Sequence, residues 1–189
     1  MYHQYPMAAD GLKLMFYGEI LTIIGVILFR MDLTEVCTQF GKGMAGVVAP
    51  TMVIGFSRAR PDDEGYQTAF MLSIISLILD FIGVFFSNGF MGNLLSIISA
   101  IVNLAVVYFV CTTTANLLHS VGAVETEQRG RTVWNIYLVS NIIAVVLDLL
   151  LFIPLLNVLA VIGMLVAAIA QLVGCVMYLM FLNSSYKLL

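Results

Sequence analysis

The chain has 189 residues, of which 61% are hydrophobic and only 10% are charged, and its mean hydropathy is +1.04. Soluble domains are about half apolar and about a quarter charged, so this composition excludes a water-soluble globule. The net charge of −3 comes from few charged residues, and no basic patch points to nucleic acid as a partner. The expected surroundings are a lipid bilayer.

Apolar runs of the length that crosses a bilayer, about 20 residues, recur along the whole chain. They predict a single all-α domain over residues 1–189, with Pro50 interrupting the second helix and Pro154 separating the last two. The helices are expected to form three antiparallel hairpins. Six transmembrane helices are predicted, at residues 11–29, 40–57, 66–86, 93–118, 132–153 and 157–182.

The distribution of basic residues predicts the orientation in the membrane. With a cytoplasmic N-terminus, only Arg30 and Lys42 lie outside. Short cytoplasmic loops are enriched in Lys and Arg, so both termini are expected in the cytoplasm of a multi-pass protein of a cell membrane of the bacterial cytoplasmic type. The first helix lacks a small-residue cleavage site and is expected to be retained. The basic residues placed inside are Lys13, Arg58, Arg60, Arg129, Arg131 and Lys187.

An internal repeat relates two of the hairpins. Residues 73–80 (Ser-Ile-Ile-Ser-Leu-Ile-Leu-Asp) align with residues 141–148 (Asn-Ile-Ile-Ala-Val-Val-Leu-Asp), and the same offset places Asn103 against Gln171. A weaker correspondence sets Gly11 against Gly65. Because each unit has an even number of helices, the pattern predicts parallel pseudo-repeats about an axis near the membrane normal.

Polar residues form stripes within the apolar helices. An acidic side chain in the bilayer costs about 2.5 to 3.5 kcal/mol on insertion scales, so such groups face protein or a water-filled cavity. The stripes therefore predict an inward polar cavity that binds or transports a small solute, a cation or a proton. The candidate binding residues are Glu19, Thr22, Ser73, Ser76, Asp80, Asn103, Asn141, Asp148 and Gln171.

Each stripe also has a structural interpretation. Asp80 and Asp148 lie near the outer helix ends, where they can reach interfacial water, and Glu19 can pair with a basic group at the inner interface. For Asn103 and Gln171, interhelical hydrogen bonds worth about 0.6 kcal/mol on average are the favoured role over ligand contact.

Motifs for catalysis and cofactors are lacking. Gly41–Gly46 matches GxGxxG without the strand and βαβ unit that a dinucleotide site requires, and His3 and His119 have no metal-ligand spacing. The cysteines, Cys37, Cys111 and Cys175, form no CxxC pair. No catalytic, cofactor-binding or metal-binding residue is expected, and a lipid-modifying intramembrane enzyme lacks a nucleophile and base.

Two functions stay open at this point. The first is a membrane protein that binds or transports a small solute or cation. The second is a structural or regulatory membrane protein, or an accessory subunit of a larger complex, that associates with a partner or with itself through small-residue faces. In length, six spans and cytoplasmic termini, the chain is similar to the S components of energy-coupling-factor transporters, which implies a solute-binding subunit with a larger partner.

Overall fold

The structure is a computed structural model that describes residues 4–31, 51–85, 90–150 and 157–189. Within these ranges the chain is all helical. Residues 51–59 form a helical segment that continues into a turn at 60–62. The remaining helices are α1 (Pro6–Met31), α3 (Glu64–Phe85), α4 (Phe90–Ser120), α5 (Val124–Leu150) and α6 (Asn157–Leu188).

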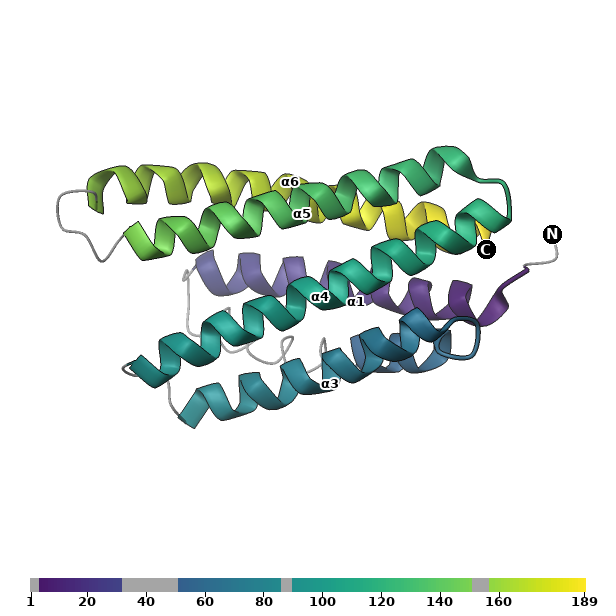
Figure 1. The fold of residues 1–189 in the computed structure, drawn as a ribbon, viewed down its shortest axis with the longest axis horizontal. Coiled ribbons are helices and arrows are strands. Elements are labelled where there is room, and N and C mark those ends of the chain that lie inside the picture. Colours follow the sequence, from purple (N-terminus) through teal and green to yellow (C-terminus); the bar gives the residue numbers. More distant parts are fainter. Residues whose placement is uncertain (1–3, 32–50, 86–89, 151–156) are drawn as a thin grey trace.

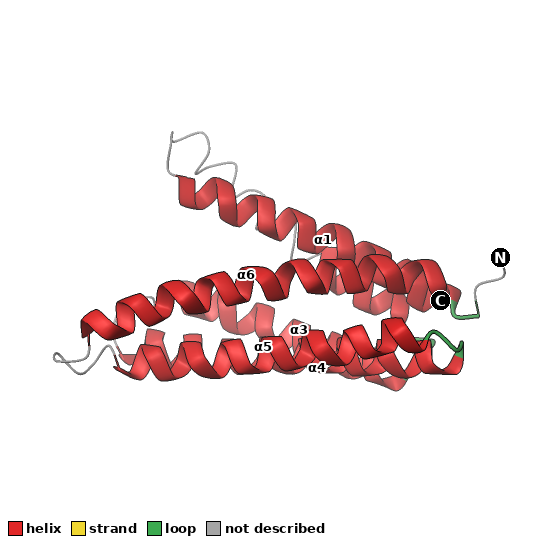
Figure 2. Cartoon of the chain, turned by 90° about the horizontal axis from the view of Figure 1, so that it is seen from above, coloured by secondary structure: helices red, strands yellow, loops and turns green. Residues whose placement is uncertain are grey.

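The helices pack antiparallel and follow one another around the bundle (Figures 1 and 2). Helix α3 packs on α4, α4 on α5, α5 on α6, and α6 on α1. Segment 51–59 lies against α1 so closely that a methyl group at Gly11 would come within 2.6 Å of the Gly55 carbonyl oxygen. The prediction of an all-α fold with six antiparallel helices is confirmed for the described residues.

Local sequence fixes the helix ends at the end of the bundle that carries both termini (Figure 1). Pro6 opens α1, where its missing N–H is no loss, and Asp63 caps α3 by accepting a hydrogen bond of 2.7 Å from Gly65 N. Helix α4 ends in a Schellman turn: Gly122 has a φ of 78°, and Ala123 N donates to Leu118 O over 2.9 Å. The Tyr5 N–H donates to Leu189 O over 3.1 Å, which joins the termini.

Helix α5 begins at Val124, whereas the apolar run predicted a start at Thr132. Two ion pairs at i,i+4 spacing continue the helix into the polar segment. Arg129 lies 2.6 Å from Glu125 and Arg131 lies 3.0 Å from Glu127. The observed α1, α4 and α6 also extend beyond the predicted ranges, because hydropathy marks the apolar part of a helix and not its end. The predicted turns at 87–89 and 154, the Gly41–Gly46 segment and Pro50 lie outside the described residues.

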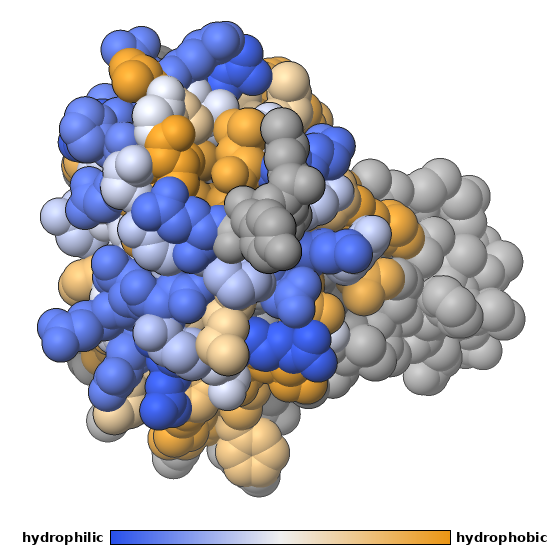
Figure 3. All heavy atoms as spheres, turned by 90° about the vertical axis from the view of Figure 1, so that its right-hand side faces the viewer, coloured by the Kyte–Doolittle hydropathy of each residue, from blue (hydrophilic) through white to orange (hydrophobic). Residues whose placement is uncertain are grey.

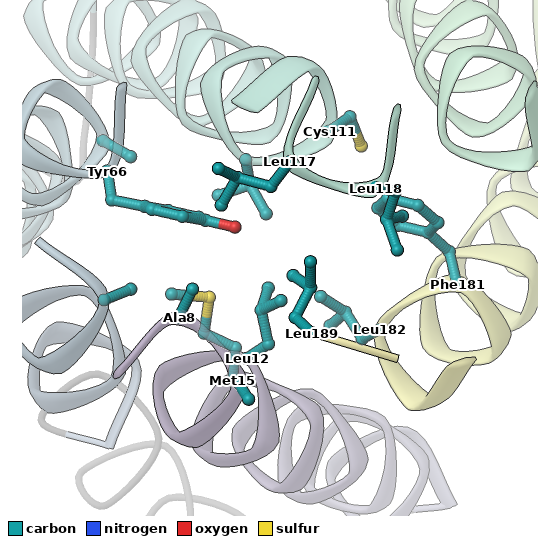
Figure 4. Close-up of a cluster of buried hydrophobic side chains, with 14 of the residues drawn as sticks. Ala8, Leu12, Met15, Tyr66, Cys111, Leu117, Leu118, Phe181, Leu182 and Leu189 are labelled. Carbon is teal, nitrogen blue, oxygen red and sulfur yellow. The ribbon is translucent and has the colours of Figure 1, made fainter. Parts of the chain in front are cut away.

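A hydrophobic core fills the half of the bundle that carries both chain termini, called the terminal half below (Figure 4). Leu12 and Met15 of α1, Leu118 of α4 and Phe181 of α6 are each at most 1% exposed. Tyr66 is fully buried among them, and its hydroxyl lies 2.7 Å from Thr114 Oγ1. This half of the bundle is closely packed, and its buried polar groups are hydrogen-bonded.

The outer surface divides into polar and apolar regions. The end that carries the termini is largely hydrophilic (Figure 3). Among the described residues, one stretch, Ile97–Ser120 in α4, is long and apolar enough to cross a membrane, and two shorter apolar stretches are Glu64–Leu79 and Leu172–Leu188. Exposed charged residues at the polar end are Asp10, Lys13, Arg58, Arg60, Glu64, Glu125, Arg129, Arg131 and Lys187.

Candidate binding cavity

A cavity of about 530 Å³ lies within the bundle, beyond the core of the terminal half. Each of the six helical segments contributes to its lining. The described lining residues are Glu19 from α1; Met52, Val53 and Phe56 from segment 51–59; Ser73, Ser76 and Leu77 from α3; Asn103, Val106 and Val107 from α4; Tyr137 from α5; and Tyr178 from α6.

Glu19 is the acidic residue among these lining residues, and no basic residue is found among them. It takes part in none of the ion pairs between described residues. Its hydrogen-bond neighbour is the Cys175 thiol, whose Sγ lies 3.9 Å from Glu19 Oε1. The Tyr137 hydroxyl donates in turn to Cys175 Sγ over 3.5 Å. A chain of phenol, thiol and carboxyl therefore joins α5, α6 and α1 at one wall.

A second polar group comes from α3 and α4. Ser76 Oγ donates to Asn103 Oδ1 over 2.9 Å, and Asn103 Nδ2 lies 3.5 Å from Ser99 Oγ. Ser73 donates to its own helix, at the Phe70 carbonyl, over 2.8 Å. Hydroxyl and amide groups thus line this side of the cavity, and Asn103 remains exposed within it.

Aromatic rings complete the cavity on the side of the core. Tyr137 and Tyr178 pack edge to face, with their ring centroids 5.8 Å apart. Phe56 and Tyr178 are at most 2% exposed, so each ring is fixed by the packing behind it. The described lining thus combines one carboxylate, a few hydroxyl and amide groups, aromatic rings and aliphatic side chains, a composition typical of small-molecule sites.

The structure brings together four of the nine predicted site residues: Glu19, Ser73, Ser76 and Asn103 all line the cavity. Two others bond to their own helices. Thr22 Oγ1 donates to Gly18 O over 3.0 Å, and Asn141 Nδ2 donates to Tyr137 O over 2.9 Å. The side chains of Asp80, Asp148 and Gln171 lie outside the described part of the structure.

The sequence interpretation missed Tyr137, Tyr178 and Phe56, because it selected Glu, Asp, Asn, Gln, Ser and Thr side chains as candidate binding residues. Their spacing held a signal. Tyr137 precedes Asn141 by one helical turn, so it continues the stripe predicted on that helix, and Tyr178 lies two turns after Gln171. Extending each stripe toward the end of the bundle that carries the termini would have included both tyrosines.

A separate charged cluster lies at the polar end of the bundle. His119 Nδ1 lies 2.8 Å from Glu127 Oε2, and Arg131 donates to Glu127 Oε1. The hydrogen bond with His119, followed by those from Arg131, holds the pKa of Glu127 below its ordinary value. The cluster ties the start of α5 to the end of α4 and is distant from the cavity lining.

Among the described residues, no three His, Cys, Asp or Glu side chains are grouped so that they could hold a metal ion. Cys111 and Cys175 are free thiols. No protein-family model, curated protein or solved structure matches the chain.

Proposed function

We propose that the protein is a multi-pass membrane protein with both termini in the cytoplasm. Large apolar side chains face outward along the helices, as lipid contact requires. The end that carries the termini is largely hydrophilic (Figure 3), and six of the eight basic residues of the chain lie there. Outward apolar residues include Met71, Ile75, Ile78, Ile101, Ile142, Val146, Val166, Ile169, Val173 and Met180.

We further propose that the cavity binds a small cationic solute and that this binding serves transport. The observation that carries the proposal is Glu19, a carboxyl group that lines the cavity and has no cationic partner among the described residues. A buried carboxylate is stable when a cation compensates its charge. The hydroxyl and amide groups of Ser76 and Asn103 supply polar contacts across the cavity.

A structural or regulatory role is the second candidate. The close approach of α1 and segment 51–59 through Gly11, Gly55 and Ala59 favours it, because small-residue contacts of this kind hold membrane helices together. This role requires no occupant in the cavity. If the role is structural, Glu19 lowers the stability of the protein, and no solute should change that stability.

Thermal unfolding of the purified protein in detergent separates the two candidates. The apparent Tm is measured with Na⁺, K⁺, Mg²⁺ and a series of small organic amines, for the wild type and for Glu19→Gln. A solute at free concentration L that binds only the folded state raises the free energy of unfolding by RT ln(1 + L/Kd), about 2.7 kcal/mol at 100 times Kd, so the Tm rises with the logarithm of the solute concentration. The control is Asp10→Asn, which removes an exposed carboxylate from the same helix.

The binding role predicts a Tm increase that is present in the wild type and in Asp10→Asn and lost in Glu19→Gln. If no solute shifts the Tm and Glu19→Gln is more stable than the wild type, the carboxyl group is not a binding group and the structural role takes its place.

A further inference from the structure

Resting on the proposed binding function, we propose that the solute is a small organic ammonium ion with an apolar body, held with its ammonium group between the Glu19 carboxylate and the ring of Tyr137. The inference concerns the chemical class of the ligand, which separates this site from one for an inorganic cation.

The described lining residues offer few oxygen ligands for a divalent metal ion. Ca²⁺ takes about six to eight oxygen ligands, and Mg²⁺ requires nearly ideal octahedral geometry. Here Glu19 provides the one carboxylate of the described lining, and its hydrogen-bond neighbour is the Cys175 thiol. The amide oxygen of Asn103 already accepts the hydrogen bond from Ser76. An ammonium group needs fewer partners, since one carboxylate and one aromatic face can serve it.

The aromatic residues stand on the same side of the cavity as the carboxylate. Tyr137 donates a hydrogen bond to Cys175, and Cys175 donates one to Glu19, so the phenol and the carboxyl group lie on the same side of the cavity. Tyr178 supports the Tyr137 ring edge to face at 5.8 Å. Carboxylate and aromatic ring together form the usual surroundings of an organic ammonium ion in proteins.

The rest of the lining fits the body of such a solute. Besides its polar and aromatic residues, the described lining contains five aliphatic or thioether side chains. The volume of about 530 Å³ falls within the range of about 300 to 1,000 Å³ that small-molecule sites occupy. The body is expected to be apolar, with room for one hydroxyl or carbonyl group near Asn103. The aliphatic and thioether residues of the described lining are Met52, Val53, Leu77, Val106 and Val107.

Calorimetric titration of the full chain in detergent tests this ligand class with matched probes. The probes are cyclohexylmethylammonium, the uncharged cyclohexylmethanol of similar shape, and NaCl and KCl. Glu19→Gln in the same detergent provides the blank for partition into micelles. The ammonium probe should bind at least about tenfold more tightly than the alcohol, since each 1.4 kcal/mol is a factor of ten.

Substitutions at Tyr137 test the aromatic wall. Tyr137→Phe keeps the ring and should bind the ammonium probe within about twofold of the wild type, whereas Tyr137→Leu should bind it roughly tenfold more weakly. Tyr108→Leu is the control, because Tyr108 is 41% exposed and does not line the cavity. The wild-type comparison of ammonium and alcohol is decisive even if a Tyr137 variant fails to fold.

The outcomes separate this inference from the proposed function. Glu19-dependent binding of Na⁺ or K⁺ without binding of the ammonium probe overturns the ligand class and leaves the cationic binding function standing. Equal affinity for the ammonium and the alcohol also overturns the ligand class. If neither the ammonium probe nor an inorganic cation binds, the binding function fails together with the inference.

Discussion

Ser76 of α3 donates a hydrogen bond of 2.9 Å to the side-chain oxygen of Asn103 of α4, and both residues line the cavity. The bond joins neighbouring helices at a point where each presents a polar side chain in an apolar segment. It satisfies the amide oxygen within the bundle and holds the amide at the cavity wall. Asn103 therefore makes an interhelical contact, and its contact with a ligand remains a prediction.

Removing this bond should lower the stability of the bundle modestly. Ser76→Ala leaves Asn103 Oδ1 without its donor, and interhelical hydrogen bonds in membrane proteins are worth about 0.6 kcal/mol on average, with a maximum of about 1.7 kcal/mol. Ser73→Ala is the matched control, because the hydrogen bond of Ser73 between described residues goes to the Phe70 carbonyl of its own helix. Unfolding in mixed micelles measures both. Equal losses for the two variants would contradict an interhelical role for Ser76.

The contact between α1 and segment 51–59 depends on Gly11. A methyl group there would lie 2.6 Å from Gly55 O and 2.7 Å from Ala59 Cβ, and backbone cannot yield as a side chain can. Gly11→Ala should therefore destabilise the protein by about 1 to 3 kcal/mol. Gly174→Ala should cost less, because its nearest neighbour is the Ile136 side chain at 3.3 Å. A smaller loss for Gly11→Ala than for Gly174→Ala would show that the two segments are not packed in this way.

Glu127 should give the polar end a pH-dependent contribution to stability. Its pKa is lowered in the folded protein, first by the hydrogen bond with His119 and then by those from Arg131. Stabilisation by such a carboxylate is present above the ordinary glutamate pKa and is lost as the pH falls through the lowered pKa. Glu127→Gln should thus be less stable than the wild type at neutral pH, with the difference closing in acid.

The control for Glu127 is Glu125→Gln, because Glu125 pairs with Arg129 in solvent and its side chain is 82% exposed. Exposed pairs of this kind contribute little, so its unfolding curve should follow the wild type at every pH. Thermal scans between neutral and acidic pH make the comparison. A difference for Glu127→Gln that persists in acid would contradict the charged role of the residue.

The proposed orientation can be tested with fusions after Leu189. The C-terminus lies beside Tyr5 and shares one end of the bundle with most basic residues, so it should be cytoplasmic. A C-terminal green fluorescent protein should fluoresce in a bacterial host, and a C-terminal alkaline phosphatase should be inactive. Active phosphatase with a dark fluorescent fusion would reverse the topology and place the polar end outside.

The number and antiparallel packing of the helices could be predicted because the length of each apolar run, and the short segment that joins it to the next, can be read directly from the sequence. The start of α6 at Asn157 agrees with the predicted start of the last helix. The start of α5 at Val124 escaped prediction, since the Glu125–Arg129 and Glu127–Arg131 pairs extend the helix through a polar segment that hydropathy assigns to a loop.

The sequence shows which polar residues share one face of a helix, but it does not show which of these faces come together in the folded bundle. Helical spacing put Ser73 and Ser76 on one face, and the structure brings them to the same cavity as Glu19. Periodicity could not tell that Thr22 would bond back to Gly18, because a hydroxyl on an apolar helix can satisfy itself within one turn. The contact between Glu19 and Cys175 joins helices far apart in sequence, and a single chain carries no local signal for it.

Thiol labelling of Ser73→Cys tests most directly whether the cavity is an aqueous binding site. Labelling of the folded protein with a positively charged methanethiosulfonate is measured site by site by mass spectrometry, with buried Cys111 as the internal control. The account predicts rapid labelling at position 73, none at Cys111, and slower labelling in Glu19→Gln or in the presence of the ammonium probe. Protection of position 73 until the protein is denatured would mean a dry interior and would contradict the binding function.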